Sequence, residues 1–150
     1  MGLDMYLEAQ RHVAPCDPRT EPMRRAIGAA IGYVPSKEKP GHDASLLEIS
    51  GVTVRVGYWR KFGDLHRWFV DNAQEGSDDC CPTYVDNHCL QALQRVCERV
   101  IDDPASVTLH FACGDGADLD VEELKYTLHV LAHAIVLQEQ GWDIYYRASW

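Results

Sequence analysis

Hydrophobic and polar residues alternate along three stretches of the chain, at residues 2–8, 51–58 and 142–147. Alternation with a period of two is typical of a β-strand that is buried on one side. In the central stretch Val52, Val54, Val56 and Tyr58 share one side. We therefore expect an N-terminal, a central and a C-terminal strand.

Four other stretches repeat their hydrophobic residues at helical spacing. Asp86 and Asp120 stand where the N-caps of the third and fourth helices are expected, and Gly76 and Gly141 where the second and fourth should end. The residues that mark the inner face, helix by helix, are Met23, Ala26, Ile27, Ala30 and Ile31; Phe62, Leu65, His66, Phe69 and Ala73; Leu90, Leu93, Val96, Cys97, Val100 and Ile101; and Leu124, Leu128, Leu131, Ile135 and Val136.

Residues 107–111 suggest one further short strand, and residues 35–45 and 113–120 have the composition of surface loops. The resulting order of elements predicts an α+β fold, with a small, mostly antiparallel sheet and about four helices on one face. A length of 150 residues suits a single globular domain over residues 1–150.

Charge is divided unevenly along the chain. Residues 1–74 carry a net charge of +1 and residues 75–150 a net charge of −10. General nucleic-acid binding needs a basic surface, so the acidic half argues against that role. No stretch approaches the roughly 18 apolar residues of a membrane span. With Asp4 and Glu8 near the start, where a signal peptide would be basic, we expect a cytoplasmic protein with no membrane partner.

Two groups of residues suggest metal ligands. His129 and His133 are four residues apart on the expected fourth helix, the spacing of helical metal sites, but position 130 is Val, so the His-Glu-x-x-His pattern is absent. The second group is Cys80, Cys81, His88 and Cys89, which lacks Cys-x-x-Cys spacing. The six cysteines are expected to remain thiols, and no cofactor is expected.

The densest cluster of candidate binding residues follows the central strand. Aromatic and basic side chains alternate there and are followed by a pair of carboxylates, so we expect stacking, cation–π contact and charge-assisted hydrogen bonds to an anionic or planar ligand. Packing at the edge of the core is the competing interpretation. The predicted ligand-binding residues are Tyr58, Trp59, Arg60, Lys61, His66, Trp68, Asp78 and Asp79.

Several stretches together resemble a family of small bacteriophage-encoded accessory proteins of unassigned function. They are Met1-Gly-Leu-Asp-Met-Tyr-Leu7, Tyr58-Trp-Arg-Lys61, His66-Arg-Trp-Phe-Val-Asp-Asn72, Gln74 with Gly76 and Asp78-Asp-Cys80, and Asp143-Ile-Tyr-Tyr-Arg-Ala-Ser-Trp150. The stretch from Leu109 to Asp118 departs from the aromatic-rich segment of that family. The resemblance implies a viral protein that acts on the host, for example as a host-defence antagonist.

No complete catalytic motif occurs, because Gly-x-Ser-x-Gly, Gly-x-Gly-x-x-Gly and phosphate-loop sequences are all missing. We therefore expect a non-enzymatic protein that captures an anionic, nucleotide-like ligand or blocks a host protein, and that forms a homo-oligomer if Trp150 is buried at a subunit contact. The alternatives are a metal-dependent enzyme that uses the His or Cys group, and an acidic mimic of nucleic acid. Mimicry requires one shared exposed face for Asp102, Asp103, Asp118, Asp120, Glu122 and Glu123.

Overall fold

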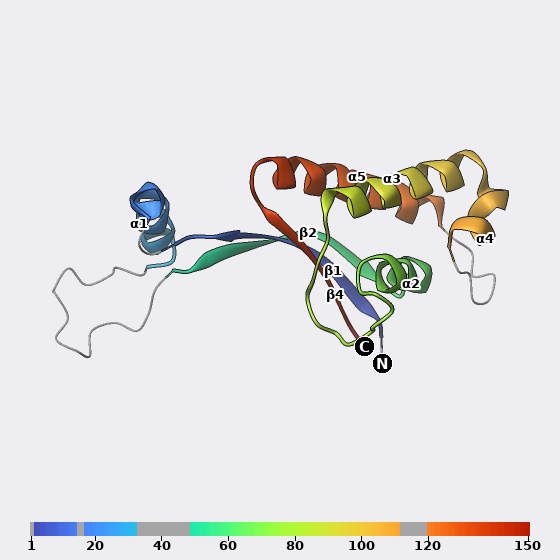
Figure 1. The fold of residues 1–150 in the computed structure, drawn as a ribbon, viewed down its shortest axis with the longest axis horizontal. Helices are drawn as coiled ribbons and strands as arrows, with labels where there is room; N and C mark the ends of the chain where they lie inside the picture. The colour runs from blue at the N-terminus through green and yellow to red at the C-terminus, as the bar shows by residue number, and fades with distance from the viewer. Residues whose placement is uncertain (1, 15–16, 33–48, 112–119) are drawn as a thin grey trace. The chain divides into compact units, whose positions relative to one another are not determined.

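The predicted α+β class is confirmed by a computed structural model, which describes residues 2–14, 17–32, 49–111 and 120–150. Figure 1 shows the helices and the antiparallel sheet. In chain order the elements are β1 (Asp4–His12), the 3-10 helix η1 (Pro18–Thr20), α1 (Glu21–Ala30), β2 (Gly51–Arg60), α2 (Gly63–Asn72), β3 (Thr83–Tyr84), α3 (Asn87–Asp102), the 3-10 helix η2 (Pro104–Ser106), α4 (Val107–His110), α5 (Val121–Glu139) and β4 (Asp143–Ser149).

The chain divides into two compact units. The larger comprises Met1–Gln10 and Thr53–Trp150, and the smaller comprises Arg11–Val52. The expectation of a single domain stays a prediction. In the smaller unit, the Val13 N–H donates to the Ser50 carbonyl at 2.8 Å. Helix α1 in the same unit begins with Glu21, whose carboxylate pairs with Arg24 and Arg25 one turn later.

The sheet has the strand order β2-β1-β4-β3. Strand β1 runs antiparallel to β4, with Met5 opposite Ala148 and Leu7 opposite Tyr146. Directly opposite residues lie on the same face of an antiparallel pair, and all four of these side chains are buried. This face of the sheet is therefore the core face, and the other face is open, as is common for antiparallel sheets.

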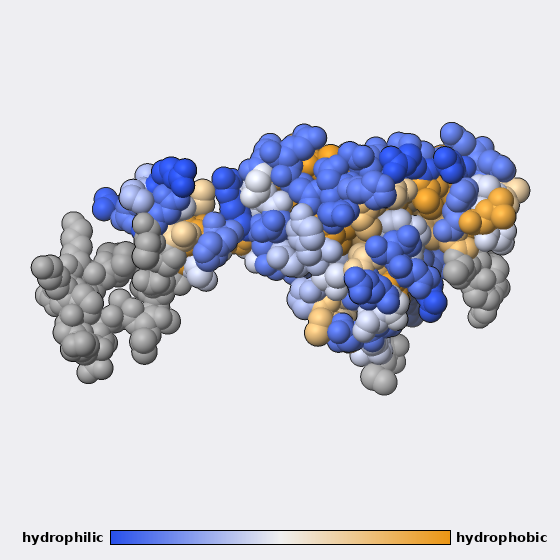
Figure 2. Space-filling model, in the orientation of Figure 1, coloured by the Kyte–Doolittle hydropathy of each residue, from blue (hydrophilic) through white to orange (hydrophobic). Residues whose placement is uncertain are grey.

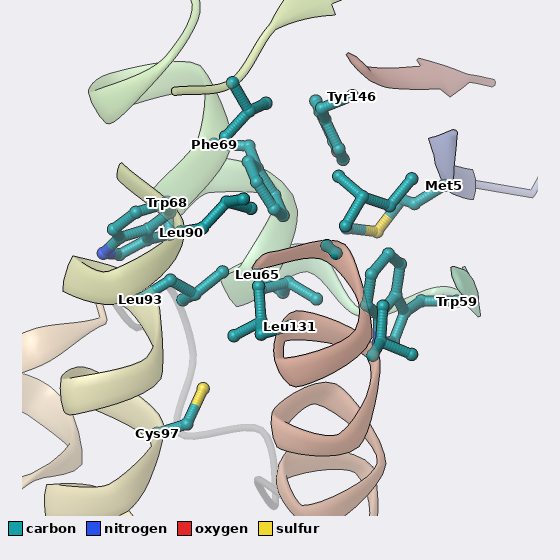
Figure 3. Packing of buried hydrophobic residues seen from close by; sticks show 14 of the residues in the cluster. Met5, Trp59, Leu65, Trp68, Phe69, Leu90, Leu93, Cys97, Leu131 and Tyr146 are labelled. Atoms are coloured by element: carbon teal, nitrogen blue, oxygen red, sulfur yellow. The ribbon is translucent and has the colours of Figure 1, made fainter. Parts of the chain in front are cut away.

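Helices α2, α3 and α5 supply the other half of the core. Figure 3 shows their side chains converging on Met5 and Tyr146 from the sheet. The ring of Phe69 stacks on that of Tyr146, with the ring centroids 4.0 Å apart. Leu93 of α3 and Leu131 of α5 are both fully buried, so the two long helices pack against each other as well as over the sheet.

The close approach of α5 to β2 depends on Gly57. A Cβ atom at this position would lie 2.5 Å from Val130 Cγ1 and 2.9 Å from Trp59 Cη2. Both distances are shorter than van der Waals contact, so the helix can approach this closely only where the strand has no side chain. Thr127 lies one turn before Val130 on α5, and its Oγ1 accepts a hydrogen bond from Trp59 Nε1 at 3.0 Å. This bond is a second link between the strand and the helix.

Several local predictions are confirmed. Asp86 accepts a hydrogen bond from the Cys89 N–H and Asp120 one from the Glu122 N–H, as N-caps do. Helix α5 ends at Glu139, and Gly141 follows with a φ of +84°, a left-handed conformation that suits glycine. The predicted loop at residues 35–45 lies outside the described residues, and so do residues 113–119 of the second predicted loop.

The prediction of a short strand at residues 107–111 is wrong. Residues 107–110 form the helix α4 instead. Asp103 accepts a hydrogen bond from the Ala105 N–H and Pro104 opens the turn η2, which feeds the chain into a helical conformation. The alternation of Val107, Leu109 and Phe111 misled because only Phe111 is fully buried, whereas Leu109 is exposed.

None of the described helices is both long enough and apolar enough to cross a lipid bilayer.

The Gly57 contact can be tested by substitution. Gly57→Ala should lower the free energy of unfolding by about 1–3 kcal/mol, because the added methyl group overpacks the interface between β2 and α5. Urea denaturation followed by circular dichroism measures the change. Gly63→Ala is the matched control, since no atom lies within 4 Å of a Cβ there. Equal stability of the Gly57→Ala variant and the wild type would contradict this account of the packing.

Candidate functional site

The structure separates the eight predicted binding residues into several groups. Trp59 and Trp68 are buried in the core, with 3% and 7% of their surfaces exposed. His66 and Asp78 contact each other. Tyr58 and Arg60 lie near Asp4 on the open face of the sheet. The remaining two, Lys61 and Asp79, are exposed and belong to none of these three groups.

Both tryptophan rings pack against other side chains of the core. Figure 3 shows Trp59 beside α5 and Trp68 beside Phe69 and Leu90. The indole of Trp59 bonds inward to Thr127, and the ring of Trp68 meets that of Phe69 edge to face at 5.5 Å. Stacking of a ligand on either residue stays a prediction, and the burial of both rings favours the packing interpretation.

Two hollows adjoin Trp68. The first has a volume of about 310 Å³ and is bordered by Asn72, Tyr84, Asp86, His88 and Cys89. The second has a volume of about 340 Å³ and is bordered by Arg67, Asp71, Asn72, His110 and Phe111. These volumes lie at the lower end of the range for small-molecule sites, about 300–1,000 Å³. Both hollows are open to solvent, so neither encloses a ligand on its own.

His66 belongs to a hydrogen-bonded chain of three side chains. Its Nε2 lies 3.0 Å from Asp78 Oδ2, and its Nδ1 lies 2.7 Å from the Tyr146 hydroxyl. Burial, and to a smaller extent Asp78, raises the pKa of Tyr146. Both ring nitrogens are used within the protein, and the ring of Trp150 lies 5.8 Å away.

The cysteine group shows little sign of reactivity. Cys80, Cys81, Cys89 and Cys97 are free thiols, and Cys16 and Cys113 lie outside the described residues. The Asp79 carboxylate raises the pKa of Cys81, and burial raises that of Cys89 to about 11. Nowhere in residues 2–14, 17–32, 49–111 and 120–150 do three His, Cys, Asp or Glu side chains gather as metal ligands do.

The open sheet face brings the predicted binding residues Tyr58 and Arg60 near three residues that were not predicted, Tyr6, Arg55 and Arg147. The guanidinium carbons of Arg55 and Arg147 lie 4.9 and 4.4 Å from the ring centroid of Tyr6. The ring of Tyr58, 40% exposed, lies 5.4 Å from that of Tyr6. We define the open-face cluster as Tyr6, Arg55, Tyr58, Arg60 and Arg147.

Acidic partners hold part of this cluster in place. The Tyr58 hydroxyl donates to Asp4 at 2.6 Å, and this hydrogen bond raises the pKa of Tyr58. Arg147 forms two hydrogen bonds with Glu8, at 3.2 and 3.3 Å, which raise the pKa of the guanidinium. The signal for this face was present in the sequence, since the polar side of the first alternating stretch contains Asp4 and Glu8 as well as a tyrosine.

The acidic residues of the mimicry hypothesis serve local structure in part. Asp103 and Asp120 cap η2 and α5, and Glu122 pairs with Lys125 at 2.7 Å. Asp118 lies outside the described residues. A shared acidic face stays a prediction.

No family model, curated protein or solved structure matches this chain.

The hydrogen-bonded chain at His66 predicts an effect on stability. Tyr146→Phe should lower the free energy of unfolding by about 1–3 kcal/mol, because the partly buried Nδ1 loses its hydrogen-bond partner. Thermal and urea unfolding measure the loss. Tyr145→Phe is the matched control on the opposite face of the same strand. A Tyr146→Phe variant as stable as the control would show that this hydrogen bond contributes nothing.

Thiol labelling tests the burial of the cysteines. Because burial raises the pKa of Cys97 to about 12, only about one thiol in ten thousand is a thiolate at pH 8, and Cys97 is also shielded from solvent. Timed reaction with iodoacetamide, followed by peptide mass spectrometry, should label the exposed Cys80 long before Cys97. The difference should disappear in urea. Equal labelling rates in the folded protein would contradict the packing of α3.

Proposed function

We propose that this chain is a non-catalytic binding protein that captures an anionic, ring-bearing ligand of the nucleotide type on the open-face cluster. The observation that carries the proposal is the placement of the Arg55 and Arg147 guanidinium groups beside the ring of Tyr6, with Tyr58 next to it. A planar base stacks on phenol rings, and a phosphate accepts paired hydrogen bonds from a guanidinium group.

The arginines of the cluster differ in how strongly the protein already engages them. Arg147 is held by Glu8, whereas Arg60 approaches Asp4 only to 3.9 Å and is largely exposed. Among the described residues no carboxylate forms an ion pair with Arg55. The donors of Arg55 therefore remain available for a phosphate, and Arg147 acts as a fixed positive charge whose position Glu8 sets.

The overall charge favours a small ligand over a nucleic-acid strand. A long polyanion would meet a chain whose net charge is −9, and repulsion would oppose contact outside the cluster. A mononucleotide or a similar signal would meet only the local arginines. The resemblance to bacteriophage accessory proteins supplies the setting of the proposal, in which the phage protein removes such a signal from a host defence.

Isothermal titration calorimetry with ATP and AMP as probes tests the proposal. Wild-type protein should bind ATP more tightly than AMP, because additional phosphates meet additional arginine donors. Arg55→Ala should weaken ATP binding by about tenfold or more, the usual effect of removing one charged hydrogen-bond donor. Tyr58→Ala should weaken both probes by a similar factor, because it removes a stacking surface.

The control is Arg95→Ala, which removes an exposed arginine of α3 and the same formal charge. Its affinities should equal those of the wild type. Absence of binding by the wild type, or equal losses for Arg55→Ala and Arg95→Ala, would overturn the proposal and leave the blocking of a host protein as the better hypothesis.

A further inference from the structure

The long helix α5 carries two neighbouring histidines that the proposed function does not use. His129 and His133 are both exposed, and their ring centroids lie 4.4 Å apart. Residues four apart on a helix project from the same side, so this proximity follows directly from the helical geometry. The planes of the rings are inclined by 69°. Two imidazoles at this spacing are the part of the helical zinc motif that supplies ligands.

The surroundings leave the imidazoles available. Between Lys125 and Glu139 the helix carries no Asp, Glu, Lys or Arg, so no charged side chain of α5 lies within this stretch. Ala132 and Val136, on the same exposed side, offer no polar atom that would compete for the ring nitrogens. Figure 2 shows hydrophobic residues between hydrophilic ones over α3 and α5.

Glu122 and Tyr126 lie two turns and one turn before His129 on the same side of α5, and both are engaged elsewhere. The Glu122 carboxylate pairs with Lys125, and the Tyr126 hydroxyl accepts a hydrogen bond from the Tyr58 N–H at 3.1 Å. Among the described residues no third His, Cys, Asp or Glu joins the two histidines. The protein itself thus offers two nitrogen ligands, and water would fill the other coordination positions of an ion.

We propose that His129 and His133 form a two-histidine clamp for a divalent transition-metal ion that prefers imidazole ligands, such as Zn²⁺, Ni²⁺ or Cu²⁺. Nitrogen ligands select these ions over Mg²⁺ and Ca²⁺, which prefer oxygen. The net charge of −9 further attracts cations to the protein. Because only two positions are filled by the protein, the bound ion keeps positions open to an external ligand.

Titration of untagged, metal-free protein with NiCl2, followed by calorimetry, tests the clamp. Wild-type protein should bind one Ni²⁺ that the double variant His129→Ala/His133→Ala does not bind. Each single variant should lose at least about tenfold in affinity, because removal of one ligand costs no less than removal of a supporting residue. Ni²⁺ should raise the melting temperature of the wild type, and this increase should be absent in the double variant.

A matched control keeps both imidazoles but separates them. In the variant His129→Ala/Ala132→His, the two histidines occupy adjacent positions 132 and 133, which face different directions on a helix. This variant should bind Ni²⁺ as weakly as a single variant. Circular dichroism of the metal-free variants confirms that they are folded. Binding by the double variant equal to that of the wild type, or full affinity of the adjacent-histidine variant, would overturn the proposal.

Discussion

The close approach of α5 to β2 joins the helices to the sheet in the larger unit. It requires the absence of a side chain at Gly57, and it is completed by the hydrogen bond between Trp59 and Thr127. Once the helix lies there, Val130 and Leu131 cover the core face of the sheet. Dense packing of this kind tolerates added volume poorly, which explains why a glycine occupies a strand position where it otherwise costs stability.

The same contact decides which residues remain for function. Because α2, α3 and α5 supply the core beside one face of the sheet, both tryptophans of the aromatic cluster become core residues, and His66 is tied to Tyr146 and Asp78. The opposite face keeps its arginines and tyrosines. The exposed side of α5 keeps its two histidines. The proposed ligand surface and the proposed metal clamp thus both consist of side chains that are not buried in the core.

The two proposals concern different chemistry and different residues. The open-face cluster offers guanidinium donors and phenol rings, which suit phosphate and planar bases, whereas the α5 pair offers imidazole nitrogen ligands to a cation. Neither includes a thiol. Burial raises the pKa of the Cys89 and Cys97 thiols. The Asp79 carboxylate raises that of Cys81.

Hydrophobic periodicity in the sequence by itself determined the α+β class, all three long strands and the helices α1, α2, α3 and α5, and side-chain capping by Asp86 and Asp120 follows from local chemistry. The sequence could not decide which aromatic residues would be buried. Tyr58 and Trp59 are neighbours, and which of the two is buried depends on where α5 packs. Only the tertiary structure placed Arg55 and Arg147, 92 positions apart, beside Tyr6. Such proximity arises from strand pairing between distant segments, which no local pattern encodes.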